Sequence, residues 1–400
     1  MALDELRQKI NGIDEQMMRL FLQRMDTVEA VAQEKKEKGL SILCPDREKT
    51  IIACNMAQVP PAEHFYALSF YQHLLELSRQ RQRELIHEGR PGGPVSDLLT
   101  RCRQPVAHPR VCVQGVEASY AMAAAKRMYP DAELAYVQKW EDIFYALAEG
   151  SCDYGVLPVE NSRAGSVGEV FDLLIQYRCY IHHAISIPVD HYLLGVRGAK
   201  INDVRRVFSH PHAFPQCSAF LKEHPRFELV PYTNTAAAAE HVAREGRLEF
   251  AAIASRDCAH IYGLDILAKS IQTSHANCTR FIAISRSPEV VPNANKVSLF
   301  FTLPHVTGSL YHTLGRFAFN SLNICKIESR PIPDRNFEYY FYLDFTGSVR
   351  ARTTLDLLNT LSEELPGFNY LGNYFEPNTP RHIDSGRGRR IIFYKYNFKI

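Results

Sequence analysis

The feature that most constrains this chain is a long, uninterrupted helical pattern at its start. Apolar residues recur there at helical spacing, namely Leu3, Leu6, Ile10, Ile13, Met17, Leu20, Val28 and Val31. No glycine or proline lies between Ile13 and Gly39, so the pattern predicts one helix of about 33 residues, on the order of 50 Å long. A helix of this length cannot bury its stripe against a small monomer. We therefore expect a three-helix unit, completed by helices over 46–58 and 62–87, that dimerises around the long helix.

A stretch rich in glycine and proline marks a domain boundary after this unit. The segment "HEGRPGGPVSD" at 87–97 holds two prolines and three glycines, a composition typical of linkers. A chain of 400 residues also exceeds what one hydrophobic core usually supports. We therefore assign residues 1–88 to a helical domain and residues 89–107 to a linker.

The composition limits the compartment and the partners. Ten cysteines are scattered singly with no C-x-x-C spacing, so we expect reduced thiols rather than disulfides or a zinc site. Neither a secretion signal nor an apolar run of about 18 residues is evident, so we expect a cytoplasmic protein without membrane contact. A formal net charge of +2 gives no field for nucleic acid. The basic cluster "SGRGRR" at 385–390 is better explained as a solvated tail than as an RNA contact.

Short β-rich runs alternate with helical stretches over residues 108–288. The first set of runs is "RVCVQG", "AELAYV", "YGVLPVE" and "YIHHAISI", and the second is "VRRVFS", "FELVPY" and "FAAIAS". Strands that alternate with helices predict a mostly parallel, doubly wound α/β sheet, and the two sets predict two lobes. Ligands of such sheets bind at the carboxyl ends of strands. The candidate positions are therefore Glu160–Asn161, Ser209–His210 and Tyr232–Thr235.

Residues 296–376 show a third pattern. Strand, helix, strand, strand, helix and strand follow one another from "KVSLFFTL" to "FNYLGNYF", which predicts a ferredoxin-like βαββαβ domain. The aromatic run from Tyr339 to Tyr342 fits two packed sheet faces better than a stacking platform. Residues 377–400 form a basic and aromatic tail.

Polar residues interrupt the apolar faces of the helical domain. Arg24 and Lys35 are eleven residues apart, a rotation of about 1100°, so both project from one face of the long helix. Arg7 lies about 100° round from Arg24. Ser78 and Gln82 form an i, i+4 pair on the third helix. These groups indicate either an anion site or a solvated, ion-paired stripe.

Here the residues resemble the helical chorismate mutase domain that is fused to prephenate dehydratase, and the resemblance extends over nearly the whole chain. In the helical domain it rests on "LRQKINGIDEQMMRLFLQR", Lys35, "DREK" and "ELSRQRQ". It implies a homodimer, or a higher homo-oligomer, whose cations bind the carboxylates and the ether oxygen of chorismate. The residues implied are Arg24, Lys35, Arg47, Glu48, Ser78 and Gln82 of one chain and Arg7 of the other.

The reaction implied for this site needs no acid or base. The Claisen rearrangement of chorismate is pericyclic, so a site must hold a compact conformer and stabilise charge on the breaking ether. One departure from the family pattern is Cys44, which replaces an aspartate two residues before Asp46. Cysteine is a poor helix N-cap, so we expect mutase activity that is retained but weakened.

The middle segment resembles prephenate dehydratase in five motifs: "QGVEASYA", "PVENSRAGSV", "SHPHAFPQC", "NTAAAA" and "NCTRF". The resemblance implies a two-lobed fold like that of periplasmic binding proteins, with Thr279 as the catalytic residue near the leaving hydroxyl. It implies substrate-binding roles for Ser119, Asn161, Ser209, Gln216, Thr235 and Arg280. For Arg280 a buried structural ion pair is an equal alternative. Ala118 and Ala121 replace a glycine and a hydroxyl residue of the family pattern, so no role is assigned to them.

No cofactor is implied. His210, His212 and Cys217 could be mistaken for metal ligands, but the family uses no metal, so we expect none.

The last domain resembles the ACT domain found at this end of the family. The resemblance implies an L-phenylalanine effector site formed by Gly308, Ser309 and Leu310 and by Glu328, Ser329, Arg330 and Pro331. A purely structural module is the alternative for this domain. For the whole chain, the alternatives are a dehydratase that prefers arogenate and a non-catalytic two-lobed sensor.

Overall fold

The computed structural model describes residues 3–86, 92–274, 276–289, 291–332 and 335–377. The chain divides into two compact units, 1–92 and 93–400, and each is described by itself. Among the described residues no helix is both long enough and apolar enough to cross a membrane.

The N-terminal unit is the expected set of three helices. They are α1 (Leu3–Lys38), α2 (Pro45–Met56) and α3 (His64–Ile86), with a 3-10 turn at Pro61–Glu63 before α3. Both α1 and α2 pack against α3. Only the second half of α1 is buried within the chain, at Val28 and Ala32. The first half of the predicted stripe stays 43–64% exposed, at Leu6, Ile10, Ile13, Met17 and Leu20.

The segment predicted as linker, 89–107, contains a short helix that the sequence did not predict. Helix α4 (Pro94–Leu99) begins with a proline in its first turn and packs on α13 (Arg352–Glu364). Asn359 of α13 accepts hydrogen bonds from the Val95 and Ser96 amides at 3.0 and 3.1 Å. Two orphan donors at the start of α4 are thereby satisfied by a residue far away in sequence, which no local pattern encodes.

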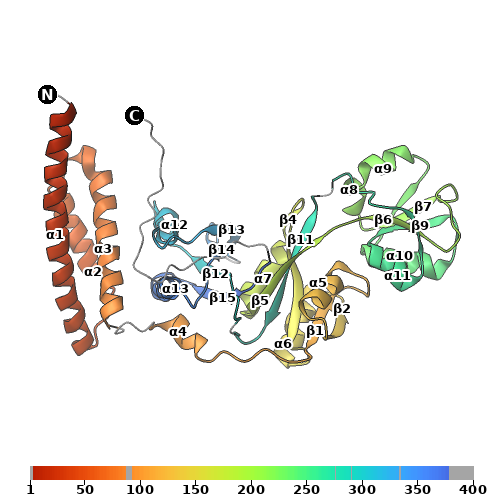
Figure 1. The fold of residues 1–400 in the computed structure, drawn as a ribbon, viewed down its shortest axis with the longest axis horizontal. Coiled ribbons are helices and arrows are strands. Elements are labelled where there is room, and N and C mark those ends of the chain that lie inside the picture. The colour runs from red at the N-terminus through yellow and green to blue at the C-terminus, as the bar shows by residue number, and fades with distance from the viewer. Residues whose placement is uncertain (1–2, 87–91, 275, 290, 333–334, 378–400) are drawn as a thin grey trace. The chain divides into compact units, whose positions relative to one another are not determined.

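The first lobe of the middle segment is a six-stranded sheet in the order β2-β1-β3-β11-β5, with β4 paired to β3 (Figure 1). Its strands are β1 (Arg110–Gln114), β2 (Glu133–Val137), β3 (Tyr154–Asn161), β4 (Gly165–Ser166), β5 (Tyr180–Pro188) and β11 (Cys278–Ser285). Its helices are α5 (Tyr120–Met128), α6 (Trp140–Glu149) and α7 (Gly168–Tyr177). Strands β1, β2 and β3 are parallel, whereas β11 is antiparallel to both β3 and β5.

The second lobe is a five-stranded sheet in the order β10-β6-β9-β7-β8. Its strands are β6 (Tyr192–Gly195), β7 (Arg206–Ser209), β8 (Glu228–Pro231), β9 (Phe250–Ala254) and β10 (Asp265–Ala268). Its helices are α8 (Ala213–Gln216), α9 (Ser218–Glu223), α10 (Thr235–Glu245) and α11 (Arg256–Tyr262). The chain crosses between the lobes twice, from β5 to β6 and from β10 back to β11. The two lobes are confirmed, but each sheet is mixed rather than mostly parallel, because these crossings place antiparallel strands in both.

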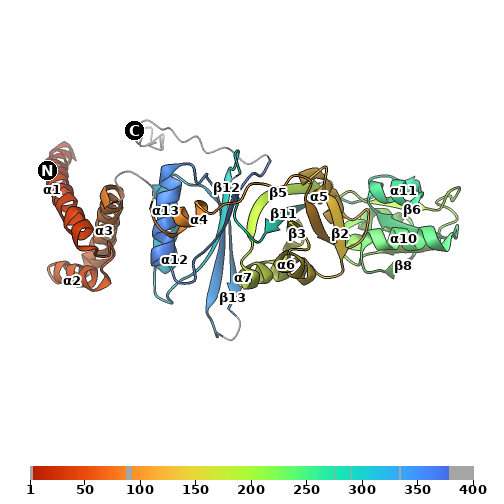
Figure 2. The same cartoon turned by 90° about the horizontal axis from the view of Figure 1, so that it is seen from below.

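The C-terminal domain has the expected βαββαβ order. It contains β12 (Lys296–Thr302), α12 (Ser309–Phe319), β13 (Ile324–Pro331), β14 (Tyr339–Thr346), α13 and β15 (Asn369–Tyr374). The sheet is antiparallel in the order β13-β14-β12-β15. Figure 2 shows α4, α12 and α13 on one face of this sheet. The predicted tail lies outside the described residues after residue 377.

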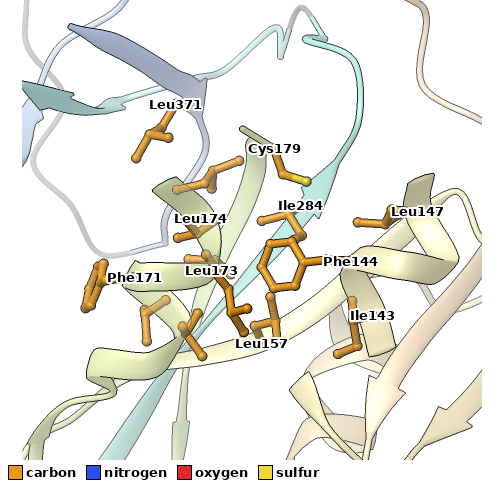
Figure 3. Packing of buried hydrophobic residues seen from close by; sticks show 14 of the residues in the cluster. Ile143, Phe144, Leu147, Leu157, Phe171, Leu173, Leu174, Cys179, Ile284 and Leu371 are labelled. Carbon is orange, nitrogen blue, oxygen red and sulfur yellow. The ribbon is translucent and has the colours of Figure 1, made fainter. Parts of the chain in front are cut away.

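The other face of this sheet shares a core with the first lobe. Leu371 of β15 belongs to the same buried cluster as Leu174, Cys179 and Ile284 (Figure 3). Gly372 has φ +143°, and a Cβ there would lie 2.2 Å from the Ile181 carbonyl oxygen. The backbones of β15 and β5 therefore approach closely where no side chain fits.

Candidate active sites

The helical unit gathers polar side chains on one stripe of α3. Its buried residues are Leu75, Ser78, Arg79, Gln82 and Arg83, which is the i, i+3, i+4 spacing of a core-facing helix. Arg24 of α1 donates to the Ser78 hydroxyl and, at 3.4 Å, to the Leu74 carbonyl. The structure thus brings the predicted Arg24, Ser78 and Gln82 to one buried face.

Two further predicted residues meet at the start of α2. Lys35 donates to the Ile42 carbonyl at 2.6 Å. Burial lowers the pKa of Lys35, and the nearby Cys44 and Glu48 partly offset this. Glu48 itself accepts from Arg79 at 2.6 Å. Cys44 is the N-cap of α2 and makes no side-chain cap hydrogen bond, as its chemistry predicts.

Sequence reasoning missed Arg79, although it lies inside the quoted segment "ELSRQRQ". The signal was its spacing, because a polar residue at a core position of an amphipathic helix needs a partner.

The other two predicted cations, Arg7 and Arg47, lie outside the polar site of the helical unit in their own chain. Arg7 is exposed and pairs with Asp4 at 3.3 Å, and Arg47 is exposed. Seventeen residues of α1 separate Arg7 from Arg24, or roughly 25 Å along the helix axis. Arg7 therefore cannot reach the Arg24 site of its own chain.

Thr279 and Asn161 form the centre of a second site, where the two crossings join the lobes. Strand β11 places Thr279 directly opposite Asn161 of β3. The Asn161 Nδ2 group donates to the Thr279 hydroxyl oxygen at 2.9 Å. The orientation of the Asn161 amide is determined by its Oδ1 atom, which accepts from the Arg163 and Ala164 amides at 3.0 and 2.9 Å. Because Asn161 can only donate, the hydroxyl hydrogen of Thr279 is left to donate elsewhere.

Asn161 is linked to Gln216 through Asn277 by further hydrogen bonds between side-chain amides. Asn161 Nδ2 donates to Asn277 Oδ1 at 2.9 Å, and Asn277 Nδ2 donates to Gln216 Oε1 at 3.0 Å. His191 Nε2 lies 2.7 Å from the same Gln216 oxygen, so it must carry the hydrogen. Burial lowers the pKa of His191, which keeps the ring neutral. The Gln216 amide hydrogens and the Thr279 hydroxyl are thus both left to donate.

Asn277 and His191 were missed from the sequence. Both lie in the segments that cross between the lobes and not at the end of a strand, so the strand-end rule did not select them. Gln272 adds a third buried polar side chain to these segments and accepts from the His191 amide at 3.0 Å.

Two of the other predicted substrate residues, Ser119 and Ser209, make hydrogen bonds that stabilise the fold. Ser119 caps α5 by accepting from the Met122 amide at 3.2 Å. Asn234, rather than Thr235, caps α10, by accepting from the Ala237 amide at 2.7 Å. Ser209 is fully buried and donates to the Ile253 carbonyl at 2.7 Å, which corrects its predicted place in a substrate site. Thr235 is half-buried at the start of α10, where backbone amides could bind an anion.

Arg280 corrects another prediction, because its structural alternative is the one observed. Its guanidinium is 10% exposed and donates to Glu376 at 2.5 Å, to Asp344 at 2.7 Å and to the Tyr374 hydroxyl at 2.8 Å. Burial acts to lower the Arg280 pKa, but Tyr374 and the two carboxylates raise it well above its ordinary value. All three nitrogens point to the C-terminal domain and not to Thr279.

The predicted effector residues divide into two groups. Ser309 and Leu310 line a hollow of about 780 Å³ together with Phe337, Tyr339 and Phe341. Gly308 precedes them in a left-handed conformation at φ +85°. In β13, Ser329 and Pro331 lie on the sheet face of Phe341 and Tyr339.

The side chains of Glu328 and Arg330 lie on the opposite face and bind the first lobe. Arg330 pairs with Asp172 of α7 at 2.7 Å, and Glu328 accepts from Ser166 of β4. Strand alternation therefore turns Glu328 and Arg330 away from the hollow of their own chain. Their predicted role as effector ligands between paired ACT domains stays a prediction.

The described residues contain no cluster of three or more His, Cys, Asp or Glu side chains arranged to hold a metal. The rings of His210 and His212 lie 5.0 Å apart, whereas Cys217 is fully buried.

Comparison with known proteins assigns both segments that carry these candidate sites to families. A family model described as chorismate mutase type II matches residues 6–83, and one described as prephenate dehydratase matches residues 111–289. The Arabidopsis thaliana protein named arogenate dehydratase/prephenate dehydratase 2, chloroplastic, is 36% identical over 293 residues, which cover 70% of this chain and 76% of that protein. The chain belongs to the prephenate dehydratase family. It carries a chorismate mutase domain before the dehydratase domain.

Other family members and solved structures extend the comparison. Arogenate dehydratase 2 of Petunia hybrida is 34% identical over 284 residues, covering 66% of this chain and 71% of that protein. A prephenate dehydratase from Arthrobacter aurescens, in complex with L-Phe, aligns with a TM-score of 0.63 and 26% identity, covering 68% of this chain and 92% of that one. A structure described as GqqA, a novel type of quorum quenching acylases, aligns with a TM-score of 0.62 and 29% identity, covering 67% and 98%.

Proposed function

We propose that this chain is a bifunctional enzyme of phenylalanine biosynthesis that rearranges chorismate to prephenate and then converts prephenate to phenylpyruvate. The observation that carries the proposal is the Thr279 hydroxyl, which accepts from Asn161 and is therefore oriented to donate.

The dehydratase step needs a hydrogen-bond donor at the leaving oxygen. The bond between the carboxylate carbon and the ring breaks, and CO2 leaves. The electron pair of that bond stays in the ring and aromatises it as the ring C–O bond breaks. The departing hydroxide takes a proton and becomes water. Thr279 stabilises the charge on that oxygen by donation. Gln216, whose Oε1 atom accepts from Asn277, offers a second donor in the same chain of amides. A threonine hydroxyl is a weak acid, so we assign it donation and not net acid catalysis.

The mutase step needs only positioned cations and an amide. Arg24 and Lys35 bind the carboxylates of chorismate, while Gln82 donates to the breaking ether. The Gln82 side chain is buried, and its Nε2 group is the part of the amide that can donate to that ether oxygen. Arg7 completes the site of a partner chain, so the mutase is a homodimer.

Arogenate is the second candidate substrate. The relatives above are named arogenate dehydratases or arogenate dehydratase/prephenate dehydratases. Arogenate differs from prephenate only by an amino group in place of the side-chain keto oxygen. The donor at the leaving hydroxyl serves both substrates equally. The preference is therefore set by the part of the site that binds the substrate's side chain.

Acyl transfer, suggested by the name of one structural neighbour, is less well supported. It needs an accessible nucleophile beside a base. Ser285 and His182 do lie 2.6 Å apart, but both are buried. Burial, with the nearby Arg103, lowers the pKa of His182 to about 3, which makes it a weak base.

The C-terminal domain is proposed to be an ACT domain that binds L-phenylalanine and inhibits the dehydratase. The hollow at Ser309 and Leu310 supports this proposal, as does the L-Phe complex of the Arthrobacter relative. The enzyme is proposed to act in a reducing compartment such as the cytoplasm. Titration calorimetry with L-phenylalanine tests the effector site, and absence of binding favours a structural module.

One set of assays tests the two activities. The purified chain is supplied with chorismate, prephenate or arogenate, and phenylpyruvate and phenylalanine are followed. Thr279→Ala should lower kcat on prephenate about 10²-fold or more. Lys35→Ala should abolish rearrangement of chorismate and leave the dehydratase unchanged. Cys278→Ser is the neighbouring control and should be silent. Near-normal turnover by Thr279→Ala would end the dehydratase assignment.

A further inference from the structure

Two adjacent rungs of the β3–β11 ladder face opposite sides of the sheet. Thr279 lies opposite Asn161, and Arg280 lies opposite Glu160. Successive side chains of a strand point to opposite faces, so the first rung faces the amide chain and the second faces the C-terminal sheet. Each member of the proposed catalytic pair is therefore adjacent to a charged residue that another domain binds.

A β-bulge separates these rungs from the rest of the ladder. Arg280 pairs with Glu160, whereas the next residue, Phe281, pairs with Pro158. The extra residue in β3 disrupts the pairing at that point. Beyond the bulge, β3 pairs with β11 at these two rungs, and its other neighbour is the two-residue strand β4. After Asn161, the Ser162 amide donates to the Cys278 carbonyl at 2.9 Å and the Cys278 amide donates to the Ser162 hydroxyl at 3.0 Å. The end of β3 that carries Asn161 therefore has only a short ladder within its own sheet.

Lys326 of β13 supplies the missing anchor from the C-terminal domain. Its ammonium lies 2.9 Å from Glu160 Oε1 and 2.8 Å from the Ser166 hydroxyl, with Glu328 at 3.2 Å. The Lys326 side chain is 13% exposed and that of Glu160 is 38% exposed, so the pair is partly screened by solvent. One ammonium thus ties both strands of the β3–β4 hairpin to β13.

We propose that Lys326 is a positioning residue for the dehydratase reaction. It holds Glu160, which fixes the adjacent Asn161, and Asn161 in turn orients the Thr279 hydroxyl as a donor. Arg280 anchors the opposite strand to the same sheet through Asp344 and Glu376. A change in the C-terminal domain is thereby transmitted to the Asn161–Thr279 pair. The inference rests on the proposed dehydratase function of Thr279.

Lys326→Met tests the proposal, because it keeps the apolar stem and removes the charge. The control is Asp172→Ala, which removes the Arg330 pair between the same strand β13 and α7 without touching either rung. In the full chain, Lys326→Met should lower kcat on prephenate about tenfold with KM within about twofold, whereas Asp172→Ala should change kcat by less than about twofold.

A double-mutant cycle with Glu160→Gln separates positioning from general stability. If Lys326 acts through Glu160, the double variant should lose no more kcat than Lys326→Met alone. Equal kcat values for Lys326→Met and Asp172→Ala, or additive losses in the cycle, would overturn the proposal. Thr279→Ala distinguishes failure of the proposed function from failure of the inference about Lys326. If Thr279→Ala is active, the proposed function fails. If it is inactive while Lys326→Met turns over normally, only this inference fails.

Discussion

At the scale of single residues, the proposed dehydratase chemistry depends on which atom donates and which accepts. The motif around Thr279 and Asn161 could be found in the sequence, but the direction of their hydrogen bond could not. That direction follows from the Arg163 and Ala164 amides, which bind the Asn161 oxygen and leave its NH2 group to donate. His191 and Asn277 extend the chain of hydrogen bonds. Asn277 opens the motif "NCTRF", whereas His191 lies outside all five motifs.

The titration of Lys35 gives a prediction at this scale. Burial lowers its pKa below the ordinary lysine value, so it loses its charge at a lower pH than an exposed lysine does. Since the cation binds a substrate carboxylate, kcat/KM of the mutase should fall on the alkaline side below pH about 10.4. Lys35→Arg should shift this limb upward, because a guanidinium keeps its charge there. A pH profile of kcat/KM for chorismate rearrangement measures the alkaline fall in the unmodified enzyme and in Lys35→Arg. A fall at the same pH in both enzymes would contradict the role of Lys35.

At the scale of elements, those that depend on their own sequence could be predicted, whereas those stabilised by distant residues could not. The spacing of apolar residues predicted α1, and the alternation of strand and helix patterns predicted the βαββαβ order, because each depends on its own sequence. The strands β6 and β10 were not predicted, since they are four residues long and pair with distant strands. The helix α4 was mistaken for linker because Asn359, far away in sequence, satisfies its first amides.

The start of α2 offers a test of this reasoning. Cys44 occupies the N-cap without a side-chain hydrogen bond. Cys44→Asp should accept from the free backbone amides of the first turn and stabilise the helical unit by about 0.5–2 kcal/mol. Thermal unfolding of the purified variant measures this gain. An unchanged or lower Tm would show that the family aspartate acts other than as a cap.

At the scale of the whole molecule, the two proposed activities lie in separate units, and we propose that the mutase site takes a residue from a second chain. The exposed apolar half of α1 and the distance of Arg7 from Arg24 both indicate that Arg7 acts in a partner's site. The dehydratase and the C-terminal domain share one core, so they respond to change together.

Mixing two inactive variants tests the shared mutase site. Arg7→Ala and Lys35→Ala should each abolish rearrangement of chorismate alone. If Arg7 acts across the dimer, each mixed dimer holds one intact site, so an equilibrated mixture should regain about a quarter of the unmodified rate. No recovery after confirmed subunit exchange would place Arg7 in its own chain or outside the site.

The most direct measurement of the central claim is the dehydratase kcat of Asn161→Asp. Aspartate has the same size and can still accept from the Arg163 and Ala164 amides, but its second oxygen accepts where the asparagine donated. The Thr279 hydroxyl would then donate to Asp and no longer to the leaving oxygen. We predict a loss of kcat of about 10²-fold or more, with mutase activity retained as the control for folding. Near-normal turnover of prephenate by this variant would contradict the account.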